Sequence, residues 1–187
     1  MPRVCVSAWR EVDDEPASEV AQRAAVALAV ALDRRGVAIH QLGRTSSVNQ
    51  RAYEQTLLDW HNSMQREVDI AIRCQRRQDS GSVLVGYHGP AQEKLAATLA
   101  AAVAGGGGQI NGRAQARPDV PFLTGSHQPA FLVELPLEGG GHWRGAAKAL
   151  ANALEPALNP RVAVSLTVPD DVELKLIING EELLLPD

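Results

Sequence analysis

The chain has 187 residues, with 18 Lys and Arg against 22 Asp and Glu, so its formal net charge is 18 − 22 = −4. The chain thus lacks the excess of basic residues that binding to nucleic-acid phosphates needs, and we expect no nucleic-acid partner. Aromatic residues are scarce, with three Trp, two Tyr and two Phe, which argues against an aromatic groove for sugars or stacked bases. A chain of this length can bury roughly 70% of its unfolded surface, which favours one domain with a small appendage.

Strand-like and helix-like segments alternate along residues 1–159. Buried strands are predicted at residues 3–8, 37–42, 68–74, 82–87 and 131–135. Helices are predicted at residues 19–35, 50–67, 92–104 and 143–158. Ser18 or a neighbour is expected to cap the first helix, and Gly36 stands where a C-cap glycine belongs. The alternation predicts an α/β fold with a mostly parallel sheet of five or six strands and helices on both faces.

The composition changes near residue 160. Residues 161–187 hold 2 positive and 6 negative side chains, which leaves 18 − 2 = 16 positive and 22 − 6 = 16 negative in residues 1–160. Apolar residues alternate in this segment, and Asn179-Gly180 is a strong hairpin signal. We therefore expect an α/β domain over 1–159 and an antiparallel β-hairpin appendage over 160–187. Its apolar face needs cover from the main domain, a protein partner or a second copy.

Several common signatures are absent from the chain. Residues 105–108 are glycines, but no Gly-Lys-Ser/Thr follows them, so a phosphate-binding loop is not expected. No run of about 18 apolar residues exists, and the N-terminus lacks a secretory signal. We expect no membrane span and synthesis in the cytoplasm, with incorporation into a particle as an option. Cys5 and Cys74 lie in predicted strands and are interpreted as buried core residues.

Histidines and serines form no familiar catalytic motif. The five histidines are scattered, without a His-Glu-x-x-His pattern. No Gly-x-Ser-x-Gly segment follows a strand, so a Ser-His-Asp arrangement has little support. His88 and His127, next to predicted strands, are the minority candidates for a replacement metal site.

Residues 3–158 carry short motifs whose order and spacing resemble the zinc-dependent N-acetylmuramoyl-L-alanine amidases of the amidase-3 family. Pro129-Ala130-Phe131-Leu132-Val133-Glu134 looks like the family strand that ends in the catalytic Glu. Asn62 and Asp69 match a helix-end Asn and an Ala-Asp pair, and Lys94-Leu95-Ala96 is similar to a family helix motif. The resemblance implies an amidase fold acting on peptidoglycan, with Glu134 as the base.

The zinc ligands of the family do not carry over. The three ligand positions fall on Trp9, Glu19 and Gln75, although the second position could slip toward Ser18 or Glu15. An indole and a carboxamide cannot replace two imidazoles as ligands of a catalytic zinc. We therefore expect no metal and no cofactor, with zinc as the alternative.

Two interpretations of Glu134 stay open: a remnant catalytic base, or a buried acid paired with an arginine. Arg10, Arg73 and Arg76 are the candidates to fill the pocket. The leading hypothesis is a degenerate, non-catalytic amidase-like protein that binds a peptidoglycan fragment or scaffolds a phage-tail-like assembly. The alternative is an active peptidoglycan amidase with an altered metal site that uses Glu134.

Overall fold

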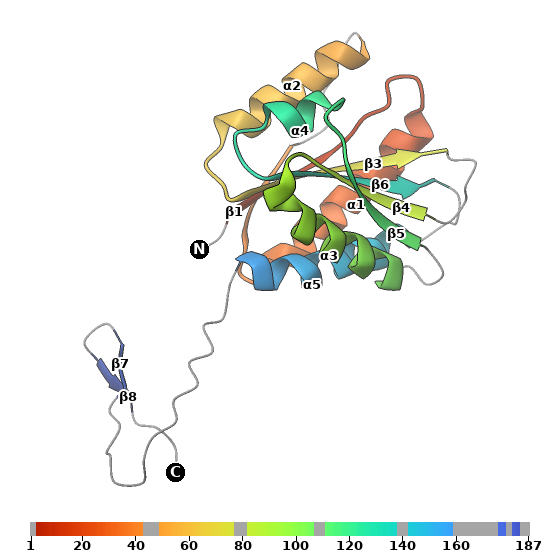
Figure 1. Ribbon diagram of the computed structural model, residues 1–187. Coiled ribbons are helices and arrows are strands. Elements are labelled where there is room, and N and C mark those ends of the chain that lie inside the picture. The colour runs from red at the N-terminus through yellow and green to blue at the C-terminus, as the bar shows by residue number, and fades with distance from the viewer. Residues whose placement is uncertain are drawn as a thin grey trace.

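The computed structural model describes residues 3–42, 49–76, 82–106, 111–137, 142–158, 176–178 and 181–183. Within these ranges one six-stranded sheet organises the chain (Figure 1). Its strands are β1 (Arg3–Ala8), β2 (Ala38–Gln41), β3 (Val68–Gln75), β4 (Ser82–Tyr87), β5 (Asn111–Ala116) and β6 (Ala130–Pro136).

The strand order is β2-β1-β3-β6-β4-β5. The first four of these strands are mutually parallel, whereas β4 pairs antiparallel with β6, and β5 runs parallel to β4. The predicted α/β class and mostly parallel sheet are confirmed. The reversal at β4 was not predicted. Because of it, the carboxyl end of β4 points in the opposite direction from the carboxyl end of β6.

Helices cover both faces of the sheet, as predicted (Figure 1). One face packs against α1 (Glu15–Asp33), α3 (Pro90–Gly106) and α5 (His142–Leu158). The other face packs against α2 (Gln50–Ser63) and the short α4 (Pro121–Gly125). Small side chains let the helices come close: a Cβ on Gly145 of α5 would lie 2.5 Å from the Gly106 carbonyl oxygen of α3.

Helix ends differ from prediction for local reasons. The first helix begins at Glu15 because Asp14, and not Ser18, is its N-cap: the Asp14 side chain accepts a hydrogen bond from the Ala17 amide. The helix then ends at Asp33 with Arg34 as its C-cap, and Gly36, which was expected at the cap, lies two residues further on with a left-handed φ of +72°. The second helix stops at Ser63, earlier than the predicted residue 67, because Met64 is already extended.

Two elements were not predicted at all. Strand β5 lies at the sheet edge and is mostly exposed, so its sequence Asn-Gly-Arg-Ala-Gln-Ala shows no apolar alternation. Gly112 is required there, since a Cβ would lie 2.0 Å from the Ala100 carbonyl oxygen of α3. Helix α4 has only five residues, too few for a periodic pattern, although Phe122 and Leu123 are buried.

In the C-terminal segment the structure describes β7 (Leu176–Ile178) and β8 (Glu181–Leu183), which pair as a separate two-stranded antiparallel sheet. The Asn179-Gly180 turn and the rest of the expected β appendage over 160–187 lie outside the described residues. No helix of the described part is long and apolar enough to cross a membrane.

Candidate functional site

Two polar clusters lie on the sheet face that α2 and α4 cover. Alternate residues of β3 and β6 point to this face. On β3 these include Asp69, near the start of the strand, and Arg73, four residues further along. The sheet register aligns Arg73 with Glu134 on β6. One cluster therefore lies at the carboxyl ends of the parallel strands, and the other lies near their amino ends.

The first group, called here the Glu134 cluster, consists of Glu134, Arg73, Gln75 and Arg117. The Glu134 side chain is 1% exposed. Its Oε1 accepts hydrogen bonds from Gln75 Nε2 at 3.0 Å and from Arg73 Nη1 at 3.3 Å. Arg117 Nη1 lies 3.6 Å from the other carboxylate oxygen. Two guanidinium groups and a carboxamide thus compensate the burial of this charge.

Arg73 is the centre of these contacts. Its Nε donates to Glu11, and its guanidinium lies over the Trp9 ring, 5.7 Å from the centroid. Trp9 is buried and packs edge-on against Phe122 of α4. The arginine therefore lies between two carboxylates and on an aromatic face, an arrangement that holds its position.

An open depression of about 380 Å³ lies beside this cluster. Arg73 and Gln75 line it together with the segment that follows β1, including Glu11 and Asp14. Arg76 also lines it, and its Nε is 3.1 Å from Asp14 Oδ2. The depression therefore offers carboxylates and guanidinium groups close together.

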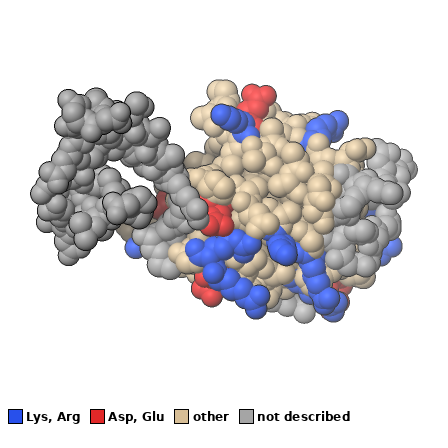
Figure 2. Space-filling model, turned by 90° about the horizontal axis from the view of Figure 1, so that it is seen from below, with Lys and Arg blue, Asp and Glu red and all other residues tan. Residues whose placement is uncertain are grey.

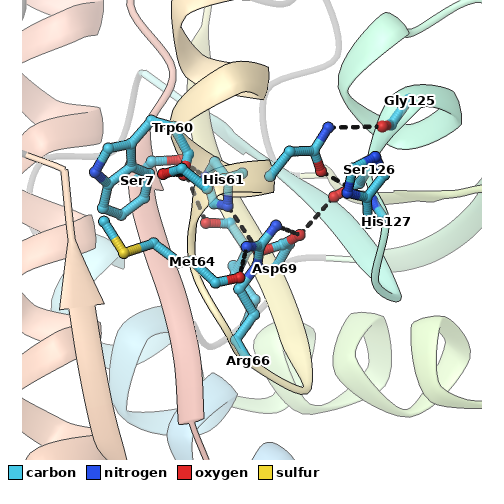
Figure 3. Close-up of polar contacts among 12 residues, drawn as sticks. Ser7, Trp60, His61, Met64, Arg66, Asp69, Gly125, Ser126 and His127 are labelled. Atoms are coloured by element: carbon cyan, nitrogen blue, oxygen red, sulfur yellow. Dashed lines mark hydrogen bonds and ion pairs between the residues drawn. The ribbon is translucent and has the colours of Figure 1, made fainter.

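The second group, called here the Asp69 cluster, consists of Asp69, His61, Ser7, Arg66 and Ser126 (Figure 3). His61 Nδ1 lies 2.8 Å from Asp69 Oδ1, and His61 Nε2 lies 2.8 Å from Ser7 Oγ. Arg66 binds both carboxylate oxygens of Asp69, with Nη2 to Oδ2 at 3.0 Å, and Ser126 donates to Oδ2. Ser7, His61 and Asp69 are fully buried.

Neighbouring contacts extend this cluster to the end of α2. Asn62 Nδ2 donates to the Gly125 carbonyl at 3.0 Å, and Asn62 Oδ1 accepts from the His127 amide at 2.9 Å. The cluster thereby ties β1, α2, β3 and the turn between α4 and β6 together (Figure 3).

Comparison with known proteins gives a consistent answer at the level of structure. The catalytic domain of the CD27L endolysin targeting Clostridia difficile superposes with a TM-score of 0.70 and 14% sequence identity, over 82% of this chain and 97% of that domain. The CwlD amidase from Clostridioides difficile, solved in complex with the GerS lipoprotein, gives a TM-score of 0.73 and 12% identity, over 84% and 98%. The N-acetylmuramoyl-L-alanine amidase from Clostridium difficile 630 gives 0.68 and 14%, over 86% and 98%.

The chain has the amidase fold. No family sequence model matches the chain, and no curated protein sequence does. In these three cases the fold is similar at only 12–14% sequence identity. The functional residues of this chain must therefore be judged from its own side chains.

The residues at the three positions that the sequence resemblance assigns to zinc ligands, Trp9, Glu19 and Gln75, do not make a ligand set for zinc in this structure. The Trp9 indole has only a donor N–H, which has no hydrogen-bond partner among the described residues. Gln75 donates its carboxamide to Glu134. Glu19 lies on the exposed surface of α1, where it pairs with Arg23 one turn away. The Arg73 guanidinium beside Glu134 adds a positive charge where a cation would have to bind.

The arginines that the sequence predicted for the pocket do not all reach Glu134. Of the three arginines proposed for the pocket, Arg73 reaches Glu134, and Arg76 lines the depression from a position where 63% of its side chain is exposed. Arg10 does not line the depression. Burial raises the pKa of Tyr53 of α2 to about 12, and the backbone and the charge of Arg10 act in the opposite direction on that pKa. Arg117, which follows the unpredicted β5, was missed.

The two candidate histidines for a replacement metal site lie far from Glu134. His88 follows β4, and since β4 is antiparallel to β6 it lies four residues beyond the partner of Glu134, about 13 Å along the sheet. His127 precedes β6 and is seven positions before Glu134. Both histidines therefore lie toward the amino end of β6, whereas Glu134 lies toward its carboxyl end. This geometry does not support an altered metal site that combines them with Glu134.

The Asp69 cluster has the connectivity of a Ser-His-Asp triad, which the sequence did not lead us to expect. Because Ser7 and His61 have no exposed surface beneath α2, no substrate carbonyl can reach the hydroxyl in this structure. The signal that the sequence analysis missed was a polar residue within a buried strand. Ser7 and Asp69 each occupy such a position facing α2, where a polar side chain requires a hydrogen-bond partner.

Cys5 of β1, together with His61 and Asp69 of this cluster, forms a candidate metal-binding group with ligand atoms within 4.8 Å of one another. A cation does not fit well there either. Both ring nitrogens of His61 are already hydrogen-bonded, and Arg66 holds the Asp69 carboxylate. Burial raises the pKa of the Cys5 thiol to about 12, so that the thiolate ligand is disfavoured. We interpret the cluster as structural.

His61 makes the stability of the protein pH-dependent. Burial lowers the pKa of His61 below its ordinary value of 6.5, against the opposing effect of Asp69. As the pH falls through 6.5, the unfolded chain binds a proton that the folded chain does not, so stability is lost toward acid pH. We expect the free energy of unfolding to fall by up to about 1.4 kcal/mol per pH unit from this group.

Chemical denaturation between pH 7.5 and 5.5 measures this slope. His61→Gln is the matched control, because its side chain stays neutral throughout, and it should show a shallower slope. Equal slopes for the native chain and His61→Gln would contradict the assignment.

Proposed function

We propose that this chain is a non-catalytic protein with an amidase fold, which uses the Glu134 cluster and the adjoining depression to bind a peptidoglycan fragment. The observation that carries the proposal is the fully compensated Glu134 carboxylate. A catalytic base must be free to accept a proton from an activated water. Here Glu134 is bonded to Gln75 and Arg73 and lies beside Arg117.

The ligand class follows from the charges of the depression. Carboxylates of Glu11 and Asp14 and guanidinium groups of Arg73 and Arg76 line it. A peptide fragment that carries both amino and carboxylate groups matches such a mixed surface. Peptidoglycan stem peptides belong to this class, and similarity to amidases supports the choice. A scaffolding role in a larger assembly, phage-tail-like or otherwise, would use the same non-catalytic body.

Metal content and cleavage test the non-catalytic part. We expect purified protein, incubated with zinc and dialysed, to retain much less than one zinc per chain by elemental analysis. We also expect no release of stem peptide from muropeptides, with a catalytically active amidase of the same fold as positive control. Stoichiometric zinc together with cleavage that Glu134→Gln abolishes would overturn the proposal in favour of an active amidase.

Binding tests the ligand part separately. Muropeptide titrated into the chain by calorimetry should give saturable binding that Arg73→Met weakens at least about tenfold, or 1.4 kcal/mol. Arg113→Met, on the exposed edge strand β5, is the matched control. Absence of binding to the native chain would rule out a peptidoglycan-fragment ligand and leave the non-catalytic assignment standing.

A further inference from the structure

Helix α1 carries an unusual outer surface. Its inner side packs on the sheet through fully buried residues such as Ala21, Leu28 and Leu32. On the opposite side Arg23, Val26, Val30 and Arg34 follow one another at spacings of three, four and four residues, and so form one ridge. We call these four residues the outer ridge.

Val26 and Val30 are 41% and 46% exposed, and they are the large apolar side chains that stand out as exposed among the described residues. They lie one turn apart, with an arginine on either side. Isolated exposed apolar residues are common, but these two are adjacent and bracketed by arginines, of which Arg23 also pairs with Glu19.

The surroundings of the outer ridge hold several basic side chains, interspersed with the acidic Glu19, Asp33 and Glu155. Figure 2 shows Lys and Arg side chains gathered in a band on the face of the domain that is seen from below. Arg144 and Lys148 of α5 are exposed. Arg35 connects the two helices, since its side chain reaches Asn152 and Glu155 of α5.

The chain itself contains a segment of complementary chemistry. Residues 161–187 carry 2 positive and 6 negative side chains, a net charge of 2 − 6 = −4 that equals the net charge of the whole protein. Apolar residues alternate with charged ones at residues 172–176 of this segment. Strands β7 and β8 pair with each other, and an isolated two-stranded sheet is at best marginally stable in water. This pair therefore needs an apolar surface to cover it.

The segment starts close enough to reach the outer ridge. It follows Leu158 at the end of α5, and the Arg35–Glu155 ion pair brings that end of α5 beside the end of α1. Residues 159–175 can span at most about 56–61 Å when extended. Helix α1 has 19 residues and is therefore about 28 Å long.

We propose that residues 161–187 dock in cis on the outer ridge, so that the β7–β8 pair covers Val26 and Val30. The carboxylates of the segment then lie near Arg23, Arg34 and the basic band. Docking of this kind depends on exposed charges and is weakened by salt.

Hydrogen exchange of the full-length chain, followed by mass spectrometry, tests the proposal. In Arg23→Glu/Arg34→Glu we expect amides of residues 176–183 to exchange about tenfold faster than in the native chain. High salt, about 0.5 M, should accelerate their exchange in the native chain as well. Arg51→Glu/Arg113→Glu is the matched control, because it makes the same charge change at exposed sites of α2 and β5.

A second variant separates docking from damage to α1. Val26→Ser/Val30→Ser removes only the apolar part of the outer ridge and should also accelerate exchange at 176–183, while the amides of α1 stay protected. Unchanged exchange of residues 176–183 in this variant would overturn the proposal. Protection that increases with protein concentration, together with a dimer mass by light scattering, would also overturn it, because docking would then occur between copies.

Discussion

Replacing Asp69 by Asn is expected to lower the free energy of unfolding by about 3–5 kcal/mol. The side chains of Asp69 and Arg66 are 0% and 1% exposed, and both carboxylate oxygens accept hydrogen bonds from the guanidinium. The amide keeps the shape but removes the charge, so the Arg66 guanidinium stays buried without its counter-charge. The carboxamide also cannot accept all the hydrogen bonds from His61, Arg66 and Ser126.

Equilibrium denaturation measures the effect, and Asp59→Asn is its control. Asp59 lies on the exposed side of α2, where it accepts a hydrogen bond from Gln55 Nε2 at 2.7 Å. The same chemical change at this exposed position should alter stability by no more than about 0.5 kcal/mol. If Asp69→Asn proved as mild as Asp59→Asn, the Asp69 cluster would not be what holds α2 to the sheet.

The second large effect is expected for Arg73→Met. Methionine keeps apolar contact with Trp9 but removes the cation from between Glu11 and Glu134. Glu134 would remain buried with Gln75 and the more distant Arg117. Losing one partner of a buried pair costs about 3–5 kcal/mol. Since the Arg73 side chain is 25% exposed and Arg117 remains, we expect a loss of about 2–3 kcal/mol.

Arg76→Met provides the comparison for this prediction. Arg76 directly follows β3, the strand that carries Arg73, and it forms an ion pair with Asp14, but its side chain is 63% exposed. Exposed pairs of this kind contribute about 0–1 kcal/mol. A loss in Arg73→Met no larger than in Arg76→Met would mean that Glu134 does not depend on Arg73. It would then be a better candidate for a residue with a titratable, catalytic role.

The sheet and its main helices could be predicted because each has a strong local pattern. Strand β6 is apolar apart from Glu134, and α1 repeats apolar residues at helical spacing before Gly36. Strand β5 could not be predicted in the same way. It lies at an exposed edge, so burial imposes no apolar pattern on it, and its place depends on the close approach of α3 at Gly112.

The candidate site could be predicted only in part. Glu134 stands out in sequence as a carboxylate within a buried strand, and an arginine partner is the ordinary way to compensate it. Which arginine serves depends on the sheet register, which aligns Arg73 with Glu134, and on β5, which delivers Arg117. Neither the register nor the reversal at β4 has a local signal.

Length, composition and net charge argued against a nucleic-acid partner, and the charge count also marked the acidic segment after residue 160. Periodicity added the α/β class, and short motifs added the resemblance to amidases. The tertiary structure decided what surrounds each charge, because ion pairs such as Arg73–Glu134 join residues 61 positions apart. It also placed Ser7 against His61, 54 positions away. Such contacts depend on how strands are ordered in the sheet, which is a property of the whole chain and not of any local segment.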